Sequence, residues 1–373
     1  MADVKALLGQ FEAMAADPKA LMDRYIAEGK KVVGCFPPYT PEELVHAAGM
    51  VPMGLWGGQV TPSVAGKYNP IFTCSLMRSC MELGMTGAYE GLSAVIMPML
   101  CDTYRGMAGA WRVGVPGVPL IAFIHPQNRT DPGARDYLAA EYRTVAERLE
   151  KMTGAQVTEE ALQKSIDVYN DHAAAMLDFC RAANEHLDVV GPVARHAVMK
   201  SARFAEKAEH AALVRQLVEQ LDALPRHAWK GKKLVLTGIT AEPDSLLEMF
   251  TAHGIAVVAD DLAQESRQYR TPVPAGKDGF DRLAGQWQGR QGCSMVHETR
   301  AERGQMLVDM AKETGADGVA VCLMRFCDVE EYDFPYISRD VEAAGMPCLC
   351  LEIDQSTQNN QQNGTKIQSF VEM

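Results

Sequence analysis

The chain has 373 residues, of which 47% are hydrophobic and 23% are charged, so it can bury the cores of two or three globular domains. Its formal net charge of -12 disfavours nucleic acid or an anionic membrane as a partner, because both attract a basic surface. The opening MADVKALLGQFEAMAADPKA lacks the basic segment and apolar run of a signal peptide, and no apolar run approaches the length of a membrane span. We therefore expect a cytoplasmic protein that binds small molecules or other proteins.

The first part of the chain is predicted to form an N-terminal helical segment (1–30) and an α/β domain (31–133). KKVVGCF and MVPMGLW are predicted strands on either side of PPYTPEELVHAAG, a helix that we expect Thr40 to cap. A helix from Ser75, the strand GLSAVIMPML, a helix after Cys101 and the strand GVPLIAFIH follow. Strands that alternate with helices indicate a parallel sheet covered on both faces.

Residues 134–228 are predicted to form a helical connecting region, because strand signals nearly vanish and strong helix formers dominate. KGKKLVLTGI then opens a second α/β domain (229–373), with further strands at IAVVADD, GADGVAVCLMRF and GMPCLCLEID. The polar QSTQNNQQNGTK is expected to precede a short closing helix. The predicted fold class is α/β, with two Rossmann-like parallel-sheet domains and additional helices between them and at the N-terminus.

Ten cysteines are present, and a reducing cytoplasm argues against a disulfide framework. Free cysteine is commonly buried, so core packing is predicted for the four that lie inside apolar runs: Cys180, Cys322, Cys348 and Cys350.

Three other cysteines stand where parallel sheets bind ligands, which is beyond the carboxyl ends of their strands. Cys101 follows VIMPML, Cys327 follows VAVCLMRF, and Cys74 ends the short run NPIFT before a predicted helix. The helix N-terminus and Arg78 are expected to stabilise a thiolate at Cys74. We therefore expect these three thiols to meet at the sheet edges.

Converging thiols can bind zinc or an iron–sulfur cluster. Zinc sites usually contain CxxC pairs, which this sequence lacks. Iron–sulfur ligation tolerates scattered cysteines, and three cysteines leave one iron open to an external ligand. The spacing alone leaves a cluster and plain core packing open as interpretations.

The segments around these cysteines resemble a known family. Five of them occur in order across nearly the whole chain: VVGCFPPYTPEELVHAAGMVPMGLWGG, FTCSLMRSCMELG, MPMLCDTYRGM, ADGVAVCLMRFCDVEEYDFPYI and GMPCLCLEIDQS. They are similar to the D-component subunits of the (R)-2-hydroxyacyl-CoA dehydratases, a superfamily that includes benzoyl-CoA reductase subunits and double-cubane cluster proteins. The length is similar to that of the smaller, β subunit, and the tail DQSTQNNQQNGTKIQSFVEM is similar to the 2-hydroxyglutaryl-CoA branch.

This resemblance implies that the chain holds one 4Fe-4S cluster through Cys74, Cys101 and Cys327. Cys80 and Cys293 are alternative ligands, and packing is the preferred interpretation of Cys80. Some family members also carry flavin, so FMN is a further cofactor that the resemblance allows, although no residue here is assigned to it.

Three charged residues next to these cysteines are candidates for tuning the cluster through hydrogen bonds and local charge: Arg78, Asp102 and Asp328. The alternative interpretation of the two aspartates is that they cap the following helices.

The resemblance implies a one-electron lyase reaction, in which 2-hydroxyacyl-CoA loses water to give the 2-enoyl-CoA. An ATP-dependent iron–sulfur activator supplies the electron, the thioester becomes a ketyl radical anion, and loss of hydroxide then makes the β-proton acidic. The larger α subunit is implied to bind the acyl-CoA, and the cluster of the smaller subunit is implied to relay the electron. No catalytic residue is therefore assigned to this chain, and it is expected to act only in the heterodimer, in anaerobic amino-acid fermentation. The sequence has no glycine-rich phosphate loop, so ATP hydrolysis is expected in the activator.

Three alternatives remain open from the sequence. A homodimeric double-cubane reductase would use these cysteines for a larger linked cluster, and a benzoyl-CoA-reductase-type subunit would belong to the same superfamily. A nonenzymatic two-lobed α/β binding protein would use the cysteines only for packing.

Overall fold

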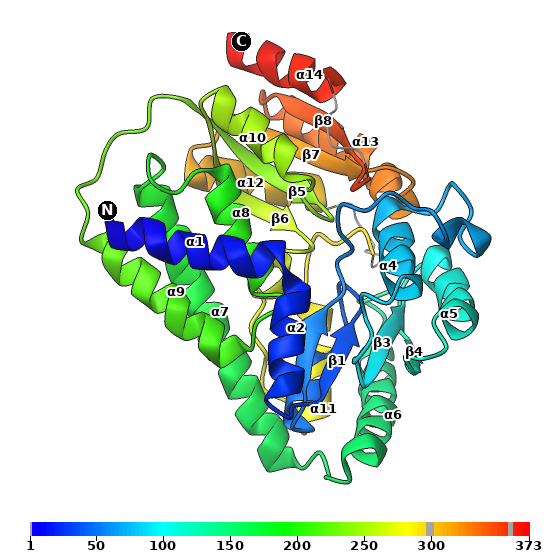
Figure 1. The fold of residues 1–373 in the computed structure, drawn as a ribbon. Helices are drawn as coiled ribbons and strands as arrows, with labels where there is room; N and C mark the ends of the chain where they lie inside the picture. The colour runs from blue at the N-terminus through cyan, green and yellow to red at the C-terminus, as the bar shows by residue number, and fades with distance from the viewer. Residues whose placement is uncertain (1, 296–301, 357–360) are drawn as a thin grey trace.

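Two parallel four-stranded sheets form the framework of the molecule in a computed structural model, which describes residues 2–295, 302–356 and 361–373 (Figure 1). The strand order is β2-β1-β3-β4 in the first sheet and β6-β5-β7-β8 in the second, and every pairing is parallel. The predicted α/β class with two parallel sheets is therefore confirmed. The strands are β1 (Val32–Cys35), β2 (Val51–Gly54), β3 (Ala94–Met99), β4 (Leu120–Ile124), β5 (Lys232–Gly238), β6 (Ile255–Leu262), β7 (Gly318–Met324) and β8 (Cys348–Ile353).

Helices connect successive strands and pack on the sheets, as parallel pairing requires. In the first sheet α5 contacts β3 and β4, and in the second α12 contacts β5, β6 and β7. The helices are α1 (Ala2–Ala16), α2 (Pro18–Ala27), α3 (Glu42–Ala47), α4 (Ser75–Met85), α5 (Asp102–Gly114), α6 (Ala134–Thr153), α7 (Glu159–Glu185), α8 (Pro192–Ser201), α9 (Lys207–Asp222), α10 (Asp244–Ala252), α11 (Gly279–Gly289), α12 (Arg303–Thr314), α13 (Asp328–Ala343) and α14 (Gln361–Glu372), with 3₁₀ turns at Ala65–Lys67 and Ser266–Gln268.

Helices α1, α7, α8 and α9 build an apolar core separate from that of the sheets. Helix α1 crosses α8 and α9, and its Phe11 belongs to the same buried cluster as Phe179 of α7 and Leu217 of α9 (Figure 1). The helical segment predicted at the N-terminus divides into α1 and α2, because Asp17 caps α2 through the Ala20 amide at 3.0 Å.

Two local predictions are wrong. Thr40 does not occupy the N-cap of α3, where Pro41 stands, because its hydroxyl donates to the Phe36 carbonyl at 2.5 Å instead. The closing helix also begins earlier than expected, since α14 starts at Gln361 inside the polar run. Residues 357–360 of that run lie outside the described residues.

The two α/β halves interlock through α6 and α11. Helix α11, from the second half of the chain, packs on α6, which itself contacts β4 of the first sheet. Arg135 of α6 donates to both carboxylate oxygens of Asp281 in α11, at 2.9 and 2.7 Å. This contact joins a helix that packs on the first sheet to a helix from the second half of the chain.

A buried histidine links α8 to the loops after β5 and β6. The His196 Nδ1 lies 2.6 Å from the Glu265 carboxylate, its Nε2 lies 3.7 Å from Glu242, and Lys200 also contacts Glu242. Burial lowers the pKa of His196, but the two carboxylates outweigh this effect and raise its pKa to about 9.

This contact predicts that the free energy of unfolding depends on pH. The pKa of His196 in the folded chain lies above its value of about 6.5 in the unfolded chain. Its contribution of about 3 kcal/mol to the free energy of unfolding is therefore fully present below pH ~6.5 and is lost as the pH rises through about 9. Urea unfolding at pH 6.5 and 9.5 should show this loss in the wild type and a much smaller one in His196→Gln. Identical pH dependence in both chains would contradict the prediction.

None of the helices in the described part of the chain is long and apolar enough to cross a membrane.

Candidate functional site

The three candidate ligands occupy equivalent positions, because each immediately precedes a helix. Cys74, Cys101 and Cys327 are the N-cap residues of α4, α5 and α13. Cys101 follows β3 and Cys327 follows β7, which places both beyond the carboxyl ends of strands as predicted. Cys74 follows a turn, in which Ile71 and Phe72 are 77% and 67% exposed. The NPIFT run therefore supplies an exposed loop ahead of the thiol.

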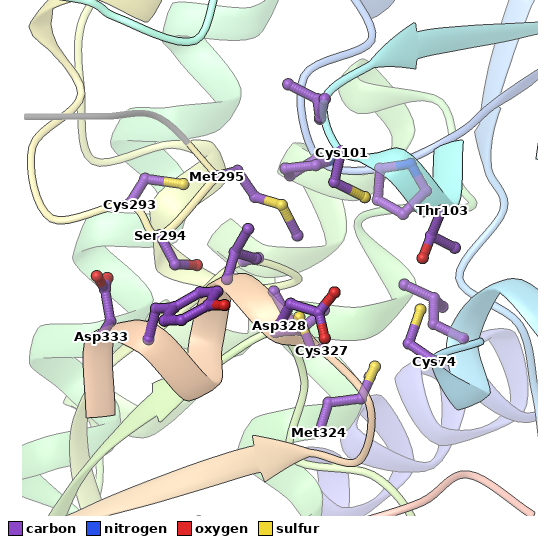
Figure 2. Close-up of a pocket in the computed structure, with 18 of the residues that line it drawn as sticks. Cys74, Cys101, Thr103, Cys293, Ser294, Met295, Met324, Cys327, Asp328 and Asp333 are labelled. Atoms are coloured by element: carbon purple, nitrogen blue, oxygen red, sulfur yellow. The ribbon is translucent and has the colours of Figure 1, made fainter. Parts of the chain in front are cut away.

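All three thiols line one cavity of about 930 Å³. Its wall combines Trp56 and Leu100 from the first half of the chain with Ile239 and Met324 from the second half. Figure 2 shows Cys74 and Cys101 on one side of this cavity, with Cys327 behind Asp328 next to them. The sequence prediction that the two sheets gather these side chains at one place agrees with this arrangement.

Burial dominates the electrostatics of the thiols. It raises the pKa of Cys74 to about 12, against the Met77 amide and Arg78, which lower it. Burial likewise raises the pKa of Cys101 and of Cys327, and each of these thiols is within electrostatic reach of Cys74. Arg78 and the Met77 amide at the start of α4 lower the pKa of Cys74 as expected, but burial has the larger effect on this pKa. Because burial raises these pKa values, it favours the protonated thiols over the thiolates.

The candidate donor set consists of the three N-cap thiols of this cavity. Within residues 2–295, 302–356 and 361–373, no three His, Cys, Asp or Glu side chains lie close enough to hold one metal ion. A cluster spreads its ligands, because each cysteine binds a different iron, and thiolates are the ligands that iron–sulfur clusters require. Three inward-facing thiols in a large cavity are therefore compatible with a 4Fe-4S cluster.

The charged neighbours of the thiols take different places. Arg78 pairs with Asp354, after β8, at 3.4 Å, and both side chains are mostly buried. Asp102 is 96% exposed and lies 3.4 Å from Arg105. Asp328 is exposed, lines the cavity, and contributes to the raised pKa of Cys74. Both Asp102 and Asp328 are first helical residues, since the cysteines themselves occupy the caps.

The two alternative ligands differ in position. Cys80 is fully buried in the core and its thiol lies 3.3 Å from the Leu55 carbonyl, which fits packing. Cys293 is buried, lines the cavity, and lies 3.5 Å from Nη1 of Arg267. In Figure 2 it stands across the cavity from Cys74.

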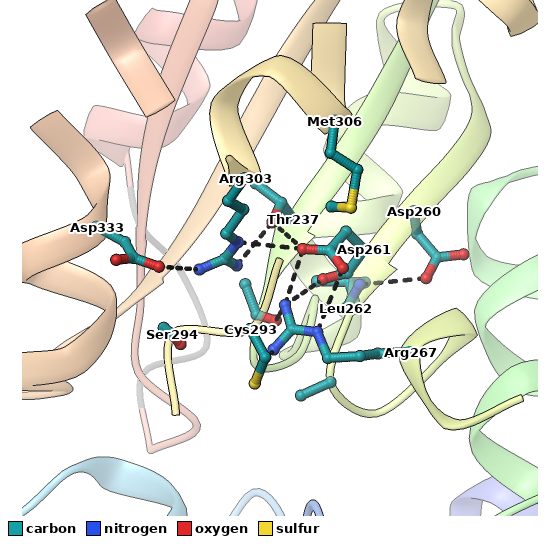
Figure 3. A network of polar contacts seen from close by, with 12 residues as sticks. Thr237, Asp260, Asp261, Leu262, Arg267, Cys293, Ser294, Arg303, Met306 and Asp333 are labelled. Atoms are coloured by element: carbon teal, nitrogen blue, oxygen red, sulfur yellow. Dashed lines mark hydrogen bonds and ion pairs between the residues drawn. The ribbon is translucent and has the colours of Figure 1, made fainter. Parts of the chain in front are cut away.

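A buried ion network behind the cavity was missed by the sequence analysis (Figure 3). Asp261, at the end of β6, is fully buried and faces Arg267 at 2.9 Å, Arg270 at 2.5 Å and Arg303 at 3.1 Å. Arg303 also pairs with Glu330 of α13 at 3.1 Å. No local pattern indicates this network, because Asp261, Arg303 and Glu330 belong to β6, α12 and α13, which are far apart in the chain.

The fold and site define a class: a two-lobed α/β protein whose two parallel sheets direct three thiols into a shared cavity. Residues 37–373 match the family model described as 2-hydroxyglutaryl-CoA dehydratase, D-component. The chain belongs to this family.

Relatives align over essentially their full lengths. The chain is 45% identical to lactoyl-CoA dehydratase subunit beta of Anaerotignum propionicum, over 100% of both chains. It is 38% identical to the (R)-phenyllactyl-CoA dehydratase beta subunit of Clostridium sporogenes, over 100% of both, and 34% identical to (R)-2-hydroxyglutaryl-CoA dehydratase, subunit beta, of Acidaminococcus fermentans, over 99% of both. The predicted resemblance to this family is therefore confirmed.

Proposed function

We propose that this chain is the β subunit of a 2-hydroxyacyl-CoA dehydratase, a hydro-lyase. Three relatives aligned along their full lengths are named as beta subunits of such dehydratases, each for a different acyl group. The identity to the lactoyl-CoA relative exceeds that to the 2-hydroxyglutaryl-CoA relative, so the proposal covers 2-hydroxyacyl-CoA as a class and does not favour the glutaryl branch. A β subunit requires a larger α subunit as its partner.

We further propose that Cys74, Cys101 and Cys327 hold a 4Fe-4S cluster in this chain. The observation that carries this proposal is the convergence of three helix N-cap thiols on one cavity, from segments as far apart as residues 74 and 327. A bound 4Fe-4S cluster supplies reversible one-electron transfer, which fits a relay between an ATP-dependent activator and the α subunit.

The chain's own residues hold the three sulfurs and shield their surroundings from water. Cys327 is 7% exposed, and apolar walls such as Trp56 and Met324 are nearly fully buried. The amides of the first turns of α4 and α5 lower the pKa of Cys74 and Cys101, so they favour the deprotonated sulfurs that iron binds.

Anaerobic coproduction tests the role as a subunit. The chain is produced with an α subunit and an ATP-dependent activator of this dehydratase family, and loss of (R)-2-hydroxyacyl-CoA is followed with ATP and a reductant. We expect turnover only when both subunits, the activator and ATP are present. Turnover by the isolated chain, or none from the complete iron-loaded mixture over lactoyl, phenyllactyl and 2-hydroxyglutaryl substrates, would contradict the proposal.

A further inference from the structure

The Glu330 carboxylate is locked directly behind Cys327. Glu330 is 0% exposed, and its carboxylate accepts from the Ser294 hydroxyl at 2.5 Å and from Nη1 and Nη2 of Arg303 at 3.2 and 3.1 Å. Its backbone amide donates to the Cys327 carbonyl at 3.0 Å. The Glu331 amide donates to the same carbonyl at 3.0 Å, so the feature that distinguishes Glu330 is its buried carboxylate, which ties the first turn of α13 to Arg303 and Ser294.

Arg303 has no freedom to serve a ligand, because its donors are occupied within the protein (Figure 3). Besides Glu330, it donates through Nε to Asp261 at 3.1 Å, through Nη1 to Asp333 at 3.2 Å and through Nη2 to Thr237 at 2.8 Å. The whole Arg303 residue is 4% exposed although it lines the cavity. We therefore regard the pair of Glu330 and Arg303 as a fixed arrangement of one negative and one positive charge.

Fixed charges next to a cluster set its reduction potential. Reduction adds an electron, so a buried carboxylate disfavours the reduced form and a buried guanidinium favours it. Glu330 stands three residues after Cys327, in the first turn of α13, and its carboxylate is fully buried there. Its charge is therefore held on the side of Cys327 where α13 begins.

We propose that Glu330, held by Arg303 and Ser294, is a positioning residue that fixes Cys327 and sets the potential of the metal centre bound there. This inference rests on the proposed function, because it requires the cluster. In this inference, the buried pair of Glu330 and Arg303 determines the net charge close to the cluster on the side of α13.

The test compares midpoint potentials in anaerobic redox titrations of the full chain, followed by electron paramagnetic resonance. Glu330→Gln keeps the size of the side chain and removes its charge, so we expect the midpoint to rise, with about a tenfold change in the one-electron equilibrium, ~59 mV. Arg303→Gln should lower the midpoint, and the double variant should return it towards the wild-type value. Glu331→Gln is the matched control, since it removes the same charge from an exposed position in the same helical turn and should leave the midpoint unchanged.

Opposite shifts in the two single variants support the inference. If the two variants have the same melting temperature, loss of iron from Glu330→Gln but not from Glu331→Gln would also support the inference. It would show that Glu330 is needed to hold Cys327 in place. An iron-loaded Glu330→Gln chain with the wild-type midpoint would overturn it while leaving the proposed function intact. A wild-type chain that binds no iron would overturn both this inference and the proposed function. If Arg303→Gln fails to fold, the comparison of Glu330→Gln with Glu331→Gln still decides the inference.

Discussion

Replacing any one of Cys74, Cys101 and Cys327 by alanine should remove nearly all iron and acid-labile sulfide from the anaerobically purified chain. Each thiolate is expected to bind a different iron, so two remaining thiolates leave the cluster exposed at two corners. Dehydratase activity with the partner subunit should fall by more than the ~10–100-fold that loss of a supporting residue typically causes. Iron and sulfide per chain, together with visible absorption, measure the effect.

Two other cysteines provide matched controls for this experiment. Cys80→Ala should keep the cluster, because the Cys80 thiol is buried in the core against the Leu55 carbonyl. Cys293→Ala should keep it as well, because Cys293 stands on the far side of the cavity. Equal loss of iron from all five variants, or loss from a control alone, would show that the ligand set is assigned incorrectly.

Replacing Asp261 by asparagine should give the largest loss of stability among single charge changes. Its carboxylate is fully buried and balances three guanidinium groups, those of Arg267, Arg270 and Arg303. These three charges hold the pKa of Asp261 far below its usual range, despite the opposing effect of burial. Removing one partner of a buried ionic network costs about 3–5 kcal/mol, because it leaves the other charges uncompensated. The midpoint of urea unfolding at neutral pH measures the loss.

An exposed ion pair supplies the comparison. Asp222 lies 2.9 Å from Arg181, and their side chains are 41% and 46% exposed. Asp222→Asn should therefore cost less than about 1 kcal/mol. If Asp261→Asn unfolds at the same urea concentration as Asp222→Asn, the buried network does not stabilise the second sheet.

Much of the fold follows from patterns that are local in the sequence. Continuous apolar runs such as VIMPML mark strands that are buried on both faces, and their alternation with helices predicts parallel pairing. The same pattern places Cys101 and Cys327 beyond strand ends, where the structure has them. The N-cap position of Cys74 also follows from the helix that begins at Ser75.

The remaining features depend on contacts between distant segments, which no local pattern specifies. Asp261 and Arg303 lie 42 residues apart, yet they meet behind the cavity. The pairing of Arg78 with Asp354 joins residues 276 positions apart. The closeness of Arg78 and Cys74 in the chain predicts an effect of Arg78 on the thiol, but burial, which depends on distant segments, has the larger effect on the pKa of Cys74.

Mössbauer spectroscopy of the iron-labelled wild-type chain, purified without oxygen and combined with iron and sulfide analysis, tests the cluster most directly. We predict about four irons and four sulfides per chain, in a spectrum typical of a single 4Fe-4S cluster. A colourless chain with less than one iron, or with one zinc ion in its place, would contradict the assignment of Cys74, Cys101 and Cys327 as cluster ligands.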